Sequence, residues 1–281
     1  MTAHLDWHLA RALLEWQVEL GATEAIGDAP VDRFALVAAA PVAPSQAPAA
    51  AEGSTDPRTD PRTESSTGPA APPPAADIDP VAEAARLADA AADLPALHDA
   101  LAAFPHCPLR QGARTCVFAD GRPEARVMVI GEAPGAQEDR LGKPFVGPAG
   151  QMLDRILAAI DLARDHPDPA RAVYISNAVP WRPPGNRDPA PDEIAMLRPF
   201  LERHIALAGP ALLVLVGNTA CQAILGERGI TRLRGRWHDW RGLPVLPTFH
   251  PSNLLHRPEN KREVWADMLT LQARLREIPA P

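Results

Sequence analysis

Cysteine is scarce, and the spacing of the few that occur carries no metal-binding or disulfide signature. Cys107, Cys116 and Cys221 are the three cysteines among 281 residues, and no two of them form a C-x-x-C pair. This pattern is typical of reduced, structural cysteines in a cytosolic protein.

Long apolar runs are missing as well. No stretch approaches the roughly 18 continuous apolar residues that a membrane span requires. The N-terminus also lacks a basic segment followed by an apolar run. We therefore expect neither a signal peptide nor a membrane partner. We expect the protein to be cytoplasmic.

Proline is abundant and unevenly spread. Residues 41–80 hold ten of the 33 prolines together with nine alanines. Such a stretch buries too little apolar surface to offset its ordering entropy, so we expect it to be disordered. The sequence predicts a helical N-terminal segment over 1–35, a disordered linker over 36–80 and a folded domain over 81–281.

Charge divides at a similar place. Residues 1–100 carry 5 basic and 16 acidic side chains, whereas residues 101–281 carry 23 and 19. A mildly basic, arginine-rich domain suits a polyanion such as DNA, although an ordinary solvated surface has the same character.

The N-terminal segment has one apolar face. Leu9, Leu13, Trp16 and Leu20 recur at steps of three and four, which predicts a helix that Gly21 ends. Because an isolated helix of this length is marginal, it needs a docking surface, either on the main domain or on a protein partner.

Beyond Cys107, apolar runs alternate with helical patterns. The predicted strands are 126–130, 173–176, 212–216 and 244–248, and the predicted helices between and after them are about 149–160, 192–208, 219–225 and 259–276. Two further helices are predicted at about 81–93 and 95–104. The alternation predicts an α/β domain with a mostly parallel central sheet and helices on both faces.

Each predicted strand runs into a polar or glycine-bearing turn. Glu132, Asn177 and His250 lie in three of these turns. The carboxyl ends of parallel strands form the ligand crevice of an open sheet, so these three side chains are candidates for one pocket.

Three segments are dense in turn residues and polar groups. Residues 131–150 contain five glycines and three prolines beside Glu132, Glu138 and Asp139. This composition indicates a backbone that approaches a ligand closely, or else a surface loop. A phosphate-binding P-loop is excluded, because no Gly-Lys-Ser/Thr follows at the required spacing.

The other two segments have structural alternatives too. Residues 177–187 combine amides and arginines that could read a base edge and contact phosphates, or form a proline-rich connection. Residues 250–257 join a histidine at a strand end to two leucines that we expect to be exposed. A single histidine in that position is more often structural.

Taken together and in this order, the segments resemble the family 4 uracil-DNA glycosylases from about Phe104 to Arg276. They match its Gly-Glu-Ala/Gly-Pro-Gly-x-x-Glu-Asp motif with a Pro-Phe-Val-Gly continuation, its Asn…Arg-Pro-Pro-x-Asn-Arg segment and its His-Pro-Ser-x-Leu-Leu motif. The resemblance implies the three-layer fold of that family.

The resemblance also implies roles for individual residues. In the catalytic set, Glu132 and Asn186 would position or activate water, and His250 would stabilise the departing base. The base of a flipped nucleotide would contact Gly131, Phe145, Asn177 and Ser252, with Phe145 stacking on uracil and Asn177 reading its edge. DNA contacts would come from Arg182, Arg187, Leu254, Leu255 and Arg257.

One departure from the family is large. The family binds a four-iron, four-sulfur cluster through four cysteines, and the matching positions here are Phe104, Cys107, Trp181 and Leu197. Because a cluster needs its full ligand set, we expect no cofactor and a hydrophobic plug in its place.

These observations leave three functions to compare. The first is a monomeric DNA repair glycosylase that flips uracil out of DNA and leaves an abasic site. The second is a glycosylase for another deaminated base, and the third is a non-catalytic DNA-binding repair scaffold. Phe145, Asn177 and His250 favour uracil excision, since a scaffold does not need them.

Overall fold

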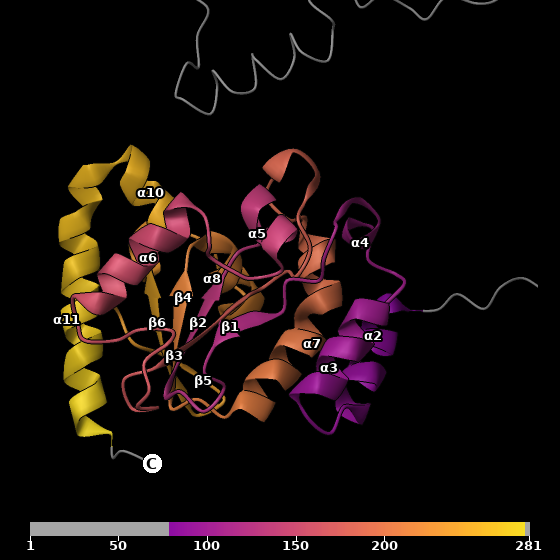
Figure 1. Ribbon diagram of the computed structural model, residues 1–281, viewed down its shortest axis with the longest axis horizontal. Coiled ribbons are helices and arrows are strands. Elements are labelled where there is room, and N and C mark those ends of the chain that lie inside the picture. The colour runs from indigo at the N-terminus through magenta and orange to yellow at the C-terminus, as the bar shows by residue number, and fades with distance from the viewer. Residues whose placement is uncertain (1–78, 279–281) are drawn as a thin grey trace, which may run out of the picture. The chain divides into compact units, whose positions relative to one another are not determined.

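The computed structural model describes residues 79–278 of the chain (Figure 1). The predicted N-terminal helix and nearly all of the predicted linker lie outside these residues. The predictions for 1–35 and 36–78 therefore stay predictions.

A six-stranded sheet forms the centre of the domain, in the order β1-β3-β2-β4-β6-β5. The four inner strands are mutually parallel, and the two short edge strands run antiparallel to their neighbours. The predicted mostly parallel sheet is therefore confirmed. The strands are β1 (Ala119–Gly121), β2 (Val127–Gly131), β3 (Val173–Asn177), β4 (Leu212–Val216), β5 (His238–Trp240) and β6 (Leu243–Thr248).

Helices cover both faces of this sheet. On one face, Met128 and Ile130 of β2 pack in a core cluster with helices α2 (Pro80–Ala90), α3 (Leu94–Ala103), α7 (Pro191–Ala208) and α8 (Asn218–Leu225). On the other face, Val127 and Val129 pack against α6 (Pro148–Ala158), α10 (Pro251–His256) and α11 (Lys261–Glu277) (Figure 1). The alternation follows from the two-residue period of a strand, whose successive side chains point to opposite faces.

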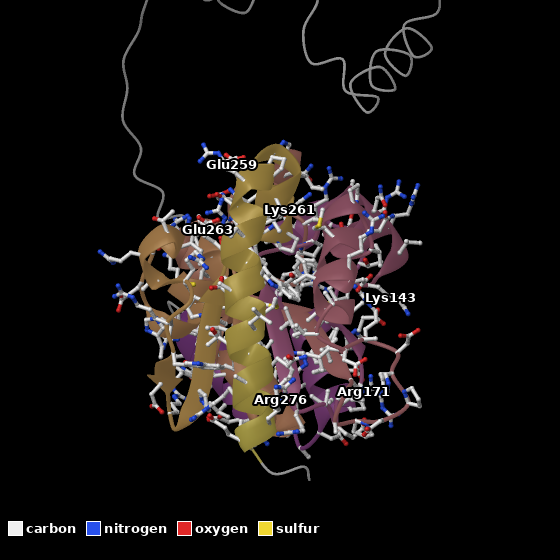
Figure 2. All side chains as sticks on the ribbon, turned by 90° about the vertical axis from the view of Figure 1, so that its left-hand side faces the viewer. Lys143, Arg171, Glu259, Lys261, Glu263 and Arg276 are labelled. Carbon is white, nitrogen blue, oxygen red and sulfur yellow. The ribbon has the colours of Figure 1, made fainter. Side chains whose placement is uncertain are left out.

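The helices agree with the predicted ones to within a few residues. Asp79 and Asp93 cap the first two through their side chains. Helix α11 runs along the domain from Lys261 to beyond Arg276 (Figure 2). The helices are α2 (Pro80–Ala90), α3 (Leu94–Ala103), α4 (Leu109–Gly112), α5 (Ala136–Leu141), α6 (Pro148–Ala158), α7 (Pro191–Ala208), α8 (Asn218–Leu225), α9 (Ile230–Leu233), α10 (Pro251–His256) and α11 (Lys261–Glu277), with 3₁₀ turns η1 (Pro184–Asn186) and η2 (Pro258–Asn260).

Eight short elements were not predicted from the sequence: the strands β1 and β5, the helices α4, α5, α9 and α10, and the 3₁₀ turns η1 and η2. The edge strands β1 and β5 have three residues each, too few to show a period. Helices α5 and α10 have six residues each and lie inside the motif segments, where glycine and proline indicate turns. Within residues 79–278, no helix is long and apolar enough to cross a membrane.

The strand register brings the functional segments to one edge of the sheet. Gly131 at the end of β2 is the register partner of Asn177 at the end of β3. Val216 and Thr248 pair in the same way at the ends of β4 and β6, so the turns after all four strands open onto the same side.

Candidate active site

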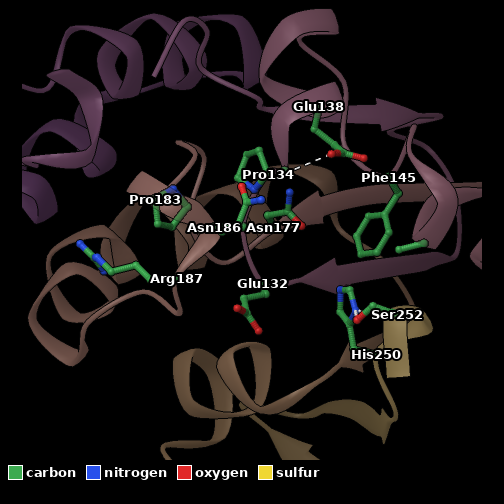
Figure 3. Close-up of a pocket in the computed structure, with 13 residues that line it drawn as sticks. Glu132, Pro134, Glu138, Phe145, Asn177, Pro183, Asn186, Arg187, His250 and Ser252 are labelled. Atoms are coloured by element: carbon green, nitrogen blue, oxygen red, sulfur yellow. Dashed lines mark hydrogen bonds between the residues drawn. The ribbon is translucent and has the colours of Figure 1, made fainter. Parts of the chain in front are cut away.

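A cavity of about 300 Å³ opens at the carboxyl ends of β2, β3 and β6 (Figure 3). Seven of the predicted site residues line it: Glu132, Phe145, Asn177, Asn186, Arg187, His250 and Ser252. The predicted meeting of Glu132, Asn177 and His250 in one pocket is therefore confirmed as geometry.

Backbone pairing continues past the ends of β2 and β3 and fixes two sides of this cavity. Ala178 N–H donates to the Gly131 carbonyl at 2.9 Å, and Val179 N–H donates to the Glu132 carbonyl at 3.0 Å. A Cβ at position 131 would overlap the Phe145 ring and Asn177 Oδ1. Gly131 therefore lets the aromatic ring and the amide approach the strand end together.

Glu132 is a partly buried carboxylate with a raised pKa. Burial is the main cause, because it disfavours the charged form, and repulsion from Asp188 adds to it. A hydrogen bond with Thr219 and the charge of Arg228 oppose the rise. Asp188 and Arg228 themselves lie 3.4 Å apart as an ion pair. Such a carboxylate can accept a proton more readily than an exposed one.

His250 caps helix α10 through its ring. Its Nδ1 atom accepts the Ser252 backbone N–H at 3.2 Å and lies 2.7 Å from Ser252 Oγ. Burial lowers the pKa of His250 to about 4, against a smaller opposing effect of Glu138. The ring is therefore neutral at pH 7, and its remaining proton is on Nε2.

Phe145 has an unusual backbone. Its φ angle is 53°, in the left-handed region that non-glycine residues rarely occupy, and holding such a residue there costs on the order of 1–3 kcal/mol. The ring is 6% exposed, and its centroid lies 5.6 Å from that of His250 with the planes tilted by 32°. This conformation turns the ring into the cavity, where Figure 3 shows it beside His250.

The segment after β3 supplies Asn186 from a tight 3₁₀ turn. Asn186 Oδ1 accepts from Arg182 Nε at 2.7 Å. The Arg187 guanidinium makes two bonds to the Glu193 carboxylate, at 2.9 and 2.6 Å. Two of the three predicted DNA-contacting arginines, Arg182 and Arg187, thus have intramolecular partners. These bonds orient Asn186 and tie the turn to α7.

The two leucines that were predicted to be exposed differ in their burial. Leu255 is 43% exposed, as expected, but Leu254 is 2% exposed and packs in the core between the sheet and helices α6 and α11. The expectation of an exposed Leu254 is wrong, because α10 turns consecutive residues to different sides. Arg257 follows the helix and is exposed. Leu254, Leu255, Arg257 and Arg182 lie outside the cavity lining.

The four positions that match the family's cluster ligands lie inside one hydrophobic core. Phe104, Cys107, Trp181 and Leu197 are each at most 2% exposed and belong to the same packed cluster. The ring of Phe104 also meets that of Phe200 edge to face at 5.3 Å.

This donor set does not fit an iron–sulfur cluster. One thiol beside the side chains of phenylalanine, tryptophan and leucine cannot supply four thiolates, and burial raises the pKa of the Cys107 thiol. Within residues 79–278, no group of three or more cysteine, histidine or acidic side chains is placed to hold a metal ion.

Several lining residues were not assigned from the sequence, chiefly Glu138, Pro134 and Pro183. Glu138 belongs to the first motif segment, yet its role depends on a hydrogen-bonding geometry that spacing does not reveal. Its carboxylate accepts from three backbone amides, of Gly135, Val146 and Gly147.

Comparison with known proteins agrees with this geometry. The family model described as the Uracil DNA glycosylase superfamily matches residues 118–269, more than half of the chain.

Several relatives carry the name type-4 uracil-DNA glycosylase, among them the following three. The protein of Thermotoga maritima is 39% identical over 158 residues, covering 55% of this chain and 79% of the relative. That of Sulfurisphaera tokodaii is 37% identical over 171 residues, covering 57% and 75%. That of Archaeoglobus fulgidus is 35% identical over 170 residues, covering 57% and 82%. The chain therefore belongs to the type-4 uracil-DNA glycosylase family of this superfamily.

Proposed function

We propose that this protein is a DNA repair enzyme that hydrolyses the N-glycosidic bond of deoxyuridine in DNA and leaves an abasic site. The observation that carries the proposal is the convergence of Glu132, Phe145, Asn177 and His250 on one cavity at the ends of three parallel strands. DNA containing uracil is the proposed partner.

Base recognition is assigned to Phe145 and Asn177. A uracil flipped out of the duplex stacks on the Phe145 ring. The Asn177 amide donates an N–H to the uracil carbonyl and accepts the ring N–H. Cytosine presents an amino donor and a bare ring nitrogen at those places, so it leaves buried polar atoms unpaired, at about 1–3 kcal/mol each.

Departure of the base is assigned to His250. As the bond between the sugar C1′ and uracil N1 breaks, its electron pair moves onto the base and its carbonyl oxygens. A neutral His250 donates a hydrogen bond from Nε2–H to one of these uracil carbonyl oxygens as negative charge develops on it, and the proton stays on the ring. The low pKa of the ring supports this role, since the neutral donor is present throughout the physiological range.

Water attack is assigned to Glu132 with Asn186. The carboxylate favours the cationic sugar and accepts a proton from water as the water oxygen bonds to C1′. Asn186 positions that water, and the bond from Arg182 fixes its amide.

The DNA contacts stay predictions. Leu255 of α10 and Arg257 just after it are exposed, and they suit the minor-groove role better than the buried Leu254. Arg182 and Arg187 have internal partners, so they act first on the geometry of the Asn186 turn. A monomeric state and a cytoplasmic location also stay predictions.

The experiment that tests the proposal also separates its alternatives. Duplexes of the same sequence with uracil, hypoxanthine or an ordinary base at one position are incubated with the protein, and abasic sites are cleaved with alkali. Cleavage at uracil alone supports the proposal. Cleavage at hypoxanthine alone indicates a different deaminated base, and binding without cleavage indicates a scaffold.

A further inference from the structure

We infer that Arg164 and Glu138 are positioning residues that hold Phe145 in its left-handed conformation and so fix the ring against the flipped base. The inference rests on the proposed stacking role of Phe145. Neither residue has an assigned role in the motifs above, and Arg164 lies outside all three.

Arg164 donates hydrogen bonds to two backbone carbonyls of the loop that contains Phe145. Its guanidinium donates to the Pro144 carbonyl through Nη1 at 3.1 Å and to the Phe145 carbonyl through Nη2 at 2.9 Å. One planar group therefore binds two successive carbonyls, a geometry that the fork of arginine allows and the point charge of lysine does not.

Two carboxylates hold that guanidinium in place. Asp120 of β1 accepts from Nη1 at 2.9 Å, and Asp154 of α6 accepts from Nε and Nη2 at 3.0 and 2.8 Å. The Arg164 side chain is 16% exposed, so water screens these contacts only in part. Through Arg164, strand β1 and helix α6 thus hold the loop that contains Phe145.

Glu138 accepts hydrogen bonds from two backbone N–H groups of the same loop. Its Oε1 atom accepts the N–H groups of Val146 at 2.9 Å and Gly147 at 2.8 Å. Its Oε2 atom accepts the N–H of Gly135 at 3.1 Å. The carboxylate therefore ties the Phe145 loop to the turn that follows Glu132.

Arg164 and Glu138 bond to the two peptide groups that flank the strained Phe145. The peptide group between Phe145 and Val146 accepts from Arg164 through its carbonyl and donates its N–H to Glu138, so rotation of this peptide would break both bonds. The Phe145 carbonyl also lies so close to Gly150 that a Cβ there would overlap it. A backbone with φ of 53° persists only where its surroundings determine it, and these contacts are that determinant.

The test uses four loop variants and one control variant of the full chain. Arg164→Met removes the fork while keeping an unbranched stem, and Arg164→Lys keeps only the charge. Glu138→Ala removes both acceptors, and Glu138→Gln keeps one carbonyl oxygen for Val146 and Gly147. Arg203→Met is the matched control, because it loses two bonds to the Ala91 carbonyl far from the cavity.

The first readout is single-turnover uracil excision per folded molecule. Arg164→Met, Arg164→Lys and Glu138→Ala should lower the maximal rate roughly 10- to 100-fold, with the half-saturating enzyme concentration little changed, because contacts to the DNA backbone are intact. Glu138→Gln should retain an intermediate rate, and Arg203→Met should match the wild type. Wild-type rates in all four loop variants would overturn the inference.

The second readout does not depend on catalysis. Hydrogen exchange of the Val146 and Gly147 amides should speed up at least about tenfold in Glu138→Ala relative to Arg203→Met. Unchanged exchange would overturn the inference even if the enzyme is active. If the wild type excises no uracil while exchange speeds up as expected, the proposed function fails and the loop clamp stands.

Discussion

The Nδ1 atom of His250 accepts the backbone N–H of Ser252 at 3.2 Å, and this contact determines which ring nitrogen can donate a hydrogen bond. A backbone N–H can only donate, so Nδ1 carries no proton and the neutral ring presents Nε2–H. His250→Ala should therefore lower the maximal rate of uracil excision about 100- to 1,000-fold, the range for one lost oxyanion donor. Single-turnover kinetics measure it. A loss below about tenfold would remove His250 from the chemistry.

Stability should depend on pH through two histidines, the buried His204 and the part-buried His250. Burial lowers the pKa of His204 to about 3 and that of His250 to about 4. The neutral His204 ring shares a hydrogen bond with the Tyr174 hydroxyl, 2.9 Å from its Nε2 atom, and stacks on the Phe118 ring with the centroids 4.2 Å apart. Since the unfolded chain takes up protons near pH 6.5 and the folded chain does not, stability is full above that pH. It falls as the pH drops toward 4.

Each histidine can contribute a slope of at most about 1.4 kcal/mol per pH unit within that window. Urea unfolding of His204→Gln between pH 4 and 6.5 should show a slope smaller than that of the wild type by up to this amount. His256→Gln, in which an exposed side chain changes, is the control. A His204→Gln slope equal to that of the wild type would show that the buried imidazole does not couple to folding.

The acid limb of the excision rate should report Glu132. Its pKa is raised by burial and by Asp188, and Arg228 opposes the rise, so activity should fall with acid at a higher pH than for an exposed glutamate. Asp188→Asn should move this limb to lower pH, and Arg228→Gln should move it to higher pH. Shifts in the same direction for both variants would exclude Glu132 as the titrating base.

The plug in place of the cluster predicts an iron-free protein whose core depends on Trp181. Purified protein should contain no stoichiometric iron by metal analysis. Trp181→Ala should lower the free energy of unfolding by about 3–5 kcal/mol, because it leaves a cavity in a closed core. Trp265→Ala, at a side chain 45% exposed, should cost much less. About four irons per chain would contradict the assignment of these positions.

The sheet could be predicted from the apolar runs in the sequence, and the meeting of the site residues from their positions directly after these runs. Apolar runs such as 212–216 fix the parallel strands, and the residue after each run reaches the same edge. The edge strands, with three residues each, have no such signal.

Contacts between distant segments lay beyond the sequence. Nothing in the motif containing Leu254 separates its buried side chain from the exposed Leu255, since α10 has only six residues. Likewise, Arg164 reaches Phe145 only because the loop after α6 folds back on α6 and β1. Side-chain partners of this kind depend on tertiary packing, which spacing along the chain does not encode.

The most direct test of the account is excision by Asn177→Asp beside the wild type, on matched duplexes with uracil or cytosine at one position. The wild type should cleave at uracil only. The variant, which replaces a donor by an acceptor, should lose uracil excision by about two orders of magnitude or more. Its melting temperature should stay close to that of the wild type, because Asn177 lies at a strand end facing the cavity. No cleavage by the wild type, or full uracil excision by a variant that melts early, would contradict the account.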